Sequence, residues 1–172
     1  MTTPAKQAIE AELDAARAEF HALLQSFGEQ DLGRQSKNLR WTNGEVLFHA
    51  AFAFMLLPWL IGIVRVSRRL PARYSGAFAK ALNFSTPAFN LVNWLGPRIG
   101  GRVFNGPRLS GLYDRTHRRI LRRLRRLSEE ELRSGMPYPS RWDPLFDDYM
   151  TIEQLVAYPI AHFRFHVGQL SR

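Results

Sequence analysis

The chain has 172 residues, of which 45% are hydrophobic and 12% aromatic. This length and apolar content favour one domain spanning residues 1–172 with a sizeable core, and they exclude an intrinsically disordered chain. The absence of cysteine excludes disulfides, zinc–thiolate sites, iron–sulfur clusters and cysteine nucleophiles. Any metal ion must therefore be held by His, Asp or Glu.

A formal net charge of +9, carried almost wholly by arginine, favours anionic partners. Nucleic acid, acidic lipid headgroups and a carboxylate-bearing small molecule all fit this sign of charge, and a bias in codon composition also explains it. No recognised nucleic-acid module accompanies the charge, so nucleic acid is not expected. The polar, amphipathic stretch up to Ala18 lacks the apolar middle of a secretory signal, which predicts a cytoplasmic protein.

The first half of the chain contains two predicted core helices. Apolar residues recur at spacings of three and four over residues 4–27, which is typical of one buried helix face, and Gly28 ends the pattern. Thr42 and Glu45 then form a capping-box pattern in front of an apolar run from Val46, where the second helix begins.

The second half of the chain contains two more predicted core helices. A helix is predicted from Gly106 and Pro107 to about residue 133, with an apolar stripe opposite a row of arginines. Thr151 begins the last helix, which carries an inner apolar stripe to residue 170. No run shows sustained period-two alternation, so we expect an all-α fold: an up-down-type four-helix bundle.

A long insertion, residues 58–106, separates the second and third core helices. It mixes apolar clusters with glycine and arginine, and we expect it to be partly helical over about 73–95. Its aromatic residues suggest an apolar pocket or lid, with plain packing as the alternative: Trp59, Phe84, Phe89 and Trp94. The patches at 59–66 and 84–95 are also candidates for peripheral membrane contact.

Residues 46–64 are long and apolar enough to be considered as a transmembrane helix. His49 is their only strongly polar side chain, and arginines follow directly. Pro58 in the middle, the capping box at the start and the amphipathic remainder of the chain favour instead the central helix of a bundle.

Three histidines form a candidate metal site. His162 and His166 are four residues apart within the inner stripe of the last helix, so both side chains point to the same side. His49 lies on the inward stripe of the second helix. Three imidazoles from two helices would leave coordination positions open for water or substrate, although spacing alone also allows hydrogen-bonded core histidines.

Two motifs resemble a known family. Residues 41–49 resemble the Trp-Ser/Thr-x-x-Glu-aliphatic-aliphatic-x-His entry to the second helix of the DinB-like superfamily, which includes mycothiol-dependent maleylpyruvate isomerases. Residues 162–170 are similar to that superfamily's His-x-x-x-His-x-Gly-Gln-aliphatic pattern in the last helix. Val167 departs from it, because an arginine is common at this position, and substrate contacts made by that arginine do not transfer.

The resemblance implies a four-helix bundle in which His49, His162 and His166 bind one divalent transition metal, zinc, nickel or iron. It further implies a metal-dependent transferase or isomerase, or a hydrolase, with a low-molecular-weight thiol as cosubstrate for a small electrophilic substrate. Relatives often form homodimers. The alternative is a non-catalytic metal-binding bundle whose basic and apolar insertion associates with a membrane surface or a protein partner.

Other polar residues have simpler explanations. His21 and His117 are expected to be ordinary helix residues, and the arginines of the third helix to form a solvated face, with acidic lipid as the alternative. Arg164 is expected at a pocket rim or subunit contact. Glu45 caps its helix and is also placed to accept a hydrogen bond from His49. The loop over 142–149, with its aspartates, is expected to be a surface turn, with a carboxylate reaching the pocket as the alternative.

Overall fold

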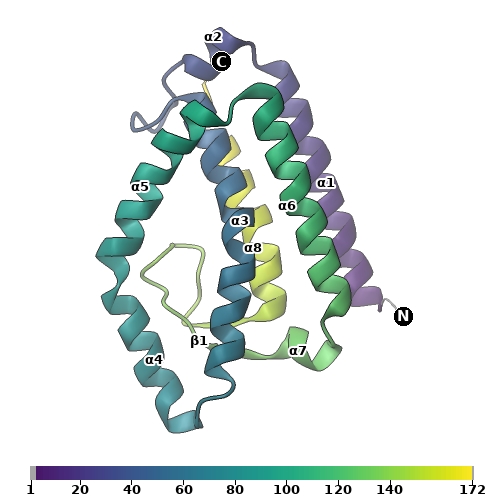
Figure 1. Cartoon of the computed structure of the whole chain (residues 1–172), viewed down its shortest axis with the longest axis vertical. Helices are drawn as coiled ribbons and strands as arrows, with labels where there is room; N and C mark the ends of the chain where they lie inside the picture. Colours follow the sequence, from purple (N-terminus) through teal and green to yellow (C-terminus); the bar gives the residue numbers. More distant parts are fainter. Residues whose placement is uncertain (1–2, 172) are drawn as a thin grey trace.

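The computed structural model describes residues 3–171, and for Ala72 and Arg73 it describes the backbone only. Within this part the chain forms eight helices and one two-stranded sheet, which confirms the all-α fold (Figure 1). The elements are α1 (Pro4–Ser26), α2 (Glu29–Gly33), α3 (Asn43–Ser67), α4 (Ala72–Phe84), α5 (Thr86–Val103), α6 (Gly106–Arg126), α7 (Glu129–Arg133), β1 (Gly135–Pro137), β2 (Tyr149–Thr151) and α8 (Ile152–Val167).

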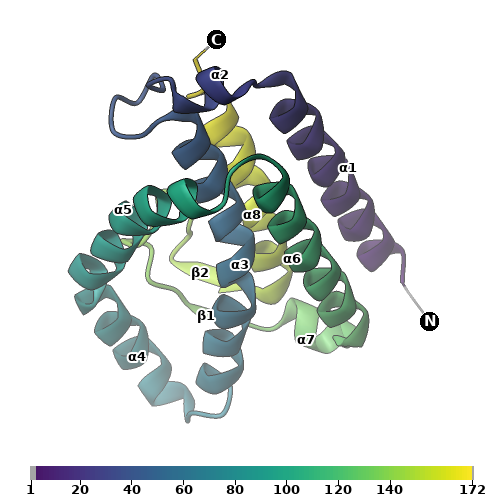
Figure 2. The same ribbon diagram turned by 45° about the horizontal axis from the view of Figure 1, so that its top comes forward.

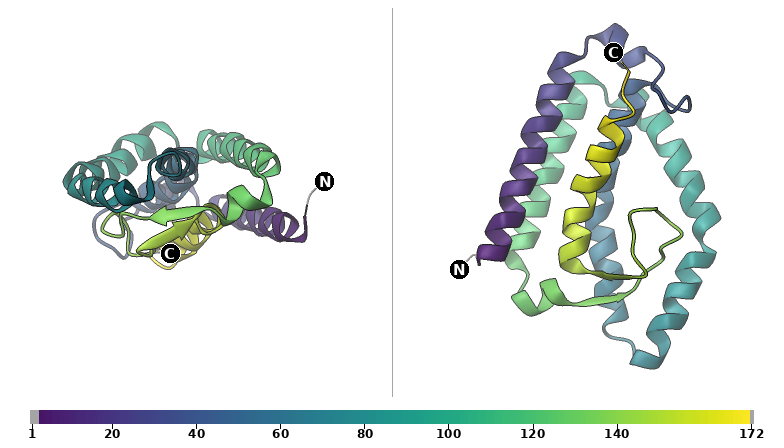
Figure 3. Two further views of the ribbon diagram at one scale, coloured as in Figure 1. Left: turned by 90° about the horizontal axis from the view of Figure 1, so that it is seen from below. Right: turned by 180° about the vertical axis from the view of Figure 1, so that it is seen from behind.

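Helices α1, α3, α6 and α8 form the bundle. Helix α3 packs against α6 and α8, and α1 packs against the same two helices from the other side. Figure 1 and the rear view in Figure 3 show α1 and α8 running in one direction and α3 and α6 in the other. The order is up-down-down-up, because the excursion through α4 and α5 returns the chain to the end where α3 begins.

Helix α3 is the central helix, with extensive packing against α8 and α5. The Thr42–Glu45 capping box begins it: the Glu45 amide donates to the Thr42 hydroxyl, and the Thr42 amide donates to the Glu45 carboxylate. The helix continues through Pro58 to Ser67, so the second half of α3 belongs to the bundle rather than to a separate insertion.

Among the described residues, α3 is the one helix whose length and composition would suit a membrane span. Its most apolar window is 61% buried inside the protein, by side chains of the neighbouring helices. This burial explains the apolar composition as that of a central bundle helix.

The expected partly helical insertion is helical almost throughout, as α4 and α5 (Figure 2). Helix α5 approaches α3 closely because two positions of α5 have no side chain. A Cβ atom at Gly100 would lie 2.0 Å from the Phe48 ring, and one at Gly101 would lie 2.9 Å from Glu45 Cγ. Glycine at these positions therefore sets the separation of the two helices.

The helix expected to reach residue 133 ends earlier. Helix α6 stops at Arg126, and Ser128 and Glu131 form a second capping box that begins the short α7. The short antiparallel pairing of β1 with β2, which period-two patterning did not indicate, follows and aligns Met136 with Met150. This pairing fixes both ends of the intervening loop.

The end of the chain is fastened to the start of α3. Buried Asn43 donates from its side chain to the Ser171 carbonyl at 2.8 Å, and the Ser171 amide donates to Asn43 Oδ1 at 3.0 Å. These two hydrogen bonds fix the position of the C-terminal end of α8 relative to the first turn of α3. That relationship brings histidines from the two helices together.

Candidate metal centre

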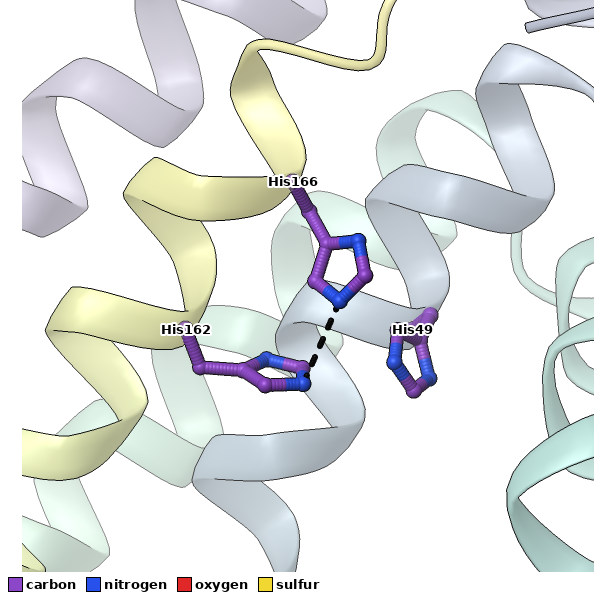
Figure 4. Close-up of side chains that lie close together, drawn as sticks. All are labelled: His49, His162 and His166. Atoms are coloured by element: carbon purple, nitrogen blue, oxygen red, sulfur yellow. Dashed lines mark hydrogen bonds between the residues drawn. The ribbon is translucent and has the colours of Figure 1, made fainter. Parts of the chain in front are cut away.

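The three histidines expected to converge lie together between α3 and α8 (Figure 4). Their ligand atoms are all within 4.8 Å of one another, and all three residues are buried. Ring centroids are 4.8 Å apart for His49 and His162, 4.6 Å for His49 and His166, and 4.5 Å for His162 and His166. Among the described residues, no other set of three His, Asp or Glu is grouped in this way.

The spacing of these nitrogens fits one metal ion. His162 Nε2 and His166 Nε2 face each other at 3.3 Å. Two nitrogens bound at about 2.0–2.1 Å to one tetrahedral ion lie about 3.3 Å apart, so the observed separation matches such a pair. Nδ1 of His49 and Nδ1 of His162 are buried and have no hydrogen-bond partner among the described residues. A buried polar atom without a partner costs folding free energy, and a bound ion would give one nitrogen of each ring a partner.

Gln169 fixes the orientation of one ring. Its Oε1 accepts a hydrogen bond from Asn38 Nδ2 at 2.9 Å and lies 2.9 Å from His166 Nδ1. An amide oxygen can only accept a hydrogen bond, so Nδ1 of His166 carries the proton. Nε2 of the neutral ring then presents its lone pair to the cluster.

Burial keeps the three rings neutral. It lowers the pKa of His49 to about 3, with a further contribution from the charge that His166 would carry. Burial likewise lowers the pKa of His162 well below its usual value and also lowers that of His166. Neutral imidazoles keep the lone pairs that a metal ligand needs, and protons do not compete for them at neutral pH.

A pocket of about 380 Å³ opens onto the histidines. Its walls come from the loop before α3, from α8, from the loop between β1 and β2, and from α5 through Asn93. Trp41 lies 4.7 Å from the His49 ring, centroid to centroid. Trp142, another wall residue, stacks on Phe89 of α5 at 4.6 Å. The insertion thus reaches the pocket through Asn93, and its Phe89 supports the wall residue Trp142.

Asp143 brings a carboxylate to this pocket. Its loop was expected to be a surface turn, but Asp143 is only 8% exposed. Its Oδ2 accepts a hydrogen bond from Tyr158 at 2.9 Å and lies 3.6 Å from His162 Nε2, while Oδ1 accepts from the Leu145 amide. Tyr158 did not stand out in the sequence, although its position four residues before His162 places both on one face of α8.

The other candidate histidines lie elsewhere. His21 Nε2 is 2.8 Å from Asp114, and His117 Nε2 is 3.0 Å from Asp14, so each pairs with a carboxylate across α1 and α6. Neither belongs to the cluster.

Two charged residues near the motifs have structural partners. Glu45 caps α3, and its carboxylate accepts no hydrogen bond from His49 Nδ1. Arg164 forms ion pairs with Glu12 and Glu19 of α1 and does not line the pocket.

The four aromatic residues expected to form an apolar pocket or lid do not line the histidine pocket, although Phe89 contacts its wall residue Trp142. Trp59 is 77% exposed and Phe84 is 89% exposed, and neither lines the histidine pocket. Trp94 lies beneath the Arg98 guanidinium at 4.0 Å.

The fold and the cluster define an all-helical bundle protein with a three-histidine site compatible with metal binding. The family model of the DinB superfamily matches residues 12–170, and the chain belongs to this superfamily. No curated protein and no solved structure matches the chain.

Proposed function

We propose that the protein is a divalent-metal-dependent enzyme that acts on a small electrophilic substrate with a low-molecular-weight thiol as cosubstrate. It would either transfer the thiol to this substrate or isomerise the substrate. The observation that carries this proposal is the convergence of three buried, neutral imidazoles at the floor of a 380 Å³ pocket. His49, His162 and His166 would hold the ion, and zinc, nickel and iron all suit imidazole ligands.

A bound divalent ion would supply Lewis acidity, lowering the pKa of a thiol or water that enters the pocket. Residues around the histidines would orient the ligands and balance the charge of the ion. Gln169 holds the His166 ring in one tautomer, and Trp41 packs beside His49. Asp143 places a negative charge beside the histidines, which offsets part of the charge of a dication held by three neutral ligands.

The thiol must come from outside, because the chain has no cysteine. In the proposed reaction the thiol loses its proton to water, and the thiolate sulfur forms a bond to the electrophilic carbon of the substrate. At the same time a π bond of that carbon, or its bond to a leaving group, breaks; the electron pair stays on the other atom of that bond, which takes up a proton from water. Such thiols are abundant in a reducing compartment, which agrees with the proposed cytoplasmic location.

Elemental analysis tests the metal. Protein purified without chelator or nickel resin is expected to contain about one equivalent of transition metal, and His49→Ala less than about a tenth of that. His21→Ala removes a histidine outside the cluster and is the matched control. Wild-type protein that neither retains metal nor takes it up on reconstitution would contradict the proposal.

The reaction is tested separately with a panel of thiols and electrophilic acceptors. Metal-loaded wild type is expected to turn over at least one pair, and His49→Ala none. Metal binding without turnover across the panel would favour the second candidate, a non-catalytic metal-binding bundle. The exposed apolar side chains of α3–α5 are the observation that favours a docking role of this kind.

A further inference from the structure

A groove between α3 and α6 gathers five guanidinium groups. It has a volume of about 460 Å³ and is lined by Arg65, Arg119, Arg122, Arg123 and Arg126. Figure 1 shows α6 next to α3, and the two helices pack against each other. No carboxylate lines the groove, although Glu131 pairs with Arg65 at 2.8 Å from outside it. Positive charge is therefore concentrated in one depression of the surface.

Two of these arginines each have a buried donor atom without a hydrogen-bond partner in the described part of the chain. Nε of Arg65 and Nε of Arg123 are buried without a hydrogen bond to any described residue. Burial lowers the pKa of Arg123, and the neighbouring charge of Arg65 lowers it further, although the Glu131 carboxylate acts in the opposite direction. An anion with several acceptor oxygens would accept hydrogen bonds from the guanidinium groups that line the groove and would relieve the repulsion between like charges.

A second, apolar groove adjoins the first. It lies between α3 and α4, has a volume of about 370 Å³, and is lined by Pro58, Trp59, Gly62, Ile63, Val66 and Phe78. Pro58 and Trp59 line both grooves, so the two meet at the Trp59 side chain. We call this pair the double groove. Its two halves suit the two ends of an anionic amphiphile.

The surrounding sequence matches a negatively charged surface. Between Glu45 and Asp114 there are eight Lys and Arg residues and no Asp or Glu. Most of the exposed large apolar side chains of the described chain fall in the same stretch, and α5 carries an outward stripe of them: Leu91, Val92, Leu95, Ile99 and Val103. Apolar side chains together with an excess of basic charge are typical of helices that lie on anionic bilayers.

We propose that the double groove binds an anionic phospholipid at a bilayer surface. The phosphate lies among the arginines of α3 and α6, an acyl chain follows the apolar groove between α3 and α4, and Trp59 sits between them. An indole at the level of the headgroups is favourable because its ring is apolar and its N–H is polar. The double groove shares no residue with the histidine pocket, so this binding is independent of the proposed enzyme activity.

Vesicle co-sedimentation of the full chain tests the proposal. We expect binding to vesicles of phosphatidylcholine with phosphatidylglycerol, weakened by salt, and little binding to phosphatidylcholine alone. The Arg119→Glu/Arg122→Glu variant is expected to bind the anionic vesicles at least about tenfold more weakly. Arg108→Glu/Arg141→Glu makes the same change in net charge at exposed positions outside the groove and is the matched control.

A second readout locates the contact. Brominated lipids in the anionic vesicles are expected to quench the tryptophan fluorescence of the wild type, and Trp59→Phe should lose most of this quenching while it still binds. His49→Ala is expected to bind vesicles as the wild type does. Circular dichroism checks that each variant is folded.

Three results would overturn the proposal. Equal loss of binding in the two charge-reversal variants would show attraction by net charge rather than by the double groove. Stabilisation by inorganic phosphate without vesicle binding would assign the arginines to a soluble anion. A dimer in sedimentation velocity that Trp59→Ala dissociates, without vesicle binding, would assign this face to a second copy of the chain.

Discussion

Nδ1 of His166 lies 2.9 Å from Oε1 of Gln169 at the end of α8. The two residues are three positions apart in the chain. The contact fixes which nitrogen of the ring carries a proton, and it therefore fixes which nitrogen can bind a metal. The side chain outside the cluster thus controls a ligand inside it.

Replacement of Gln169 is expected to weaken metal binding. Gln169→Leu removes the acceptor for His166 Nδ1, and loss of such a contact typically lowers metal affinity by about 10–100-fold. Competition with a chelator measures the change. Gln169→Glu keeps an oxygen acceptor at this position and should retain most of the affinity; equal weakening in both variants would show that the hydrogen bond is not the cause.

Gly100 is expected to tolerate no side chain. The Cβ of Gly100→Ala would lie 2.0 Å from the Phe48 ring, so α5 must move away from α3 or the ring must leave the core. Overpacking of this kind costs about 1–3 kcal/mol of unfolding free energy, measured by urea denaturation. Gly76→Ala is the control, because no atom lies within 4 Å of its Cβ and it replaces glycine in a helix, which should be neutral or stabilising. A stable Gly100→Ala protein would contradict the close packing of α5 on α3.

The contacts of Asp114 with Arg17 and His21 are expected to make the free energy of unfolding depend on pH in the acidic range. The hydrogen bond from Arg17 is the largest cause that lowers the pKa of Asp114, to about 2. Because the folded-state pKa lies below the unfolded value, the carboxylate stabilises the protein above about pH 4, and this stabilisation is lost as the pH falls towards 2.

For this partly exposed group the effect is about 1 kcal/mol once solvent screening is taken into account. Thermal unfolding at about pH 6 and about pH 2 measures it. Asp114→Asn should be less stable than the wild type at the higher pH, and the two should converge at the lower. A constant difference between them would show that ionisation of Asp114 is not involved.

The stacking of Phe89 on Trp142 is expected to hold the loop over the histidine pocket. Phe89→Ala removes this contact, and the amide of Leu145, which donates to Asp143, should then exchange its hydrogen faster. Hydrogen exchange measured by NMR reports it. Leu91→Ala, an exposed position on the same helix, is the control and should leave the exchange of Leu145 unchanged. Unchanged protection in Phe89→Ala would show that the strands alone hold the loop.

The sequence predicted the core helices and the three histidines because those features are local. Capping pairs mark the starts of α3 and α8, and a spacing of four places His162 and His166 on one face. His49 lies on the inward stripe of its own helix, and the family resemblance strengthened its place as the third member. That these residues bind metal stays a prediction.

The features that sequence did not predict depend on contacts distant in the chain. Pro58 ordinarily ends or kinks a helix, yet α3 continues because Leu57, Leu60 and Ile61 are buried around it and packing offsets the lost hydrogen bond. Asp143 reaches His162 because β1 and β2 pair and Tyr158 holds the carboxylate, none of which follows from local pattern. The Ser128 capping box was a local signal that could have marked the end of α6.

The Thr42–Glu45 capping box also bears on the electrostatic potential at the histidines. Each helix has a partial positive charge at its N-terminus and a partial negative charge at its C-terminus. His166 is in the last turn of α8, where the free carbonyl groups favour a cation. The opposing field from the start of α3 is countered by the Glu45 carboxylate in its first turn. The C-terminal end of α8 thus favours a positive ion at the cluster, and Glu45 offsets the opposing effect of the α3 N-terminus.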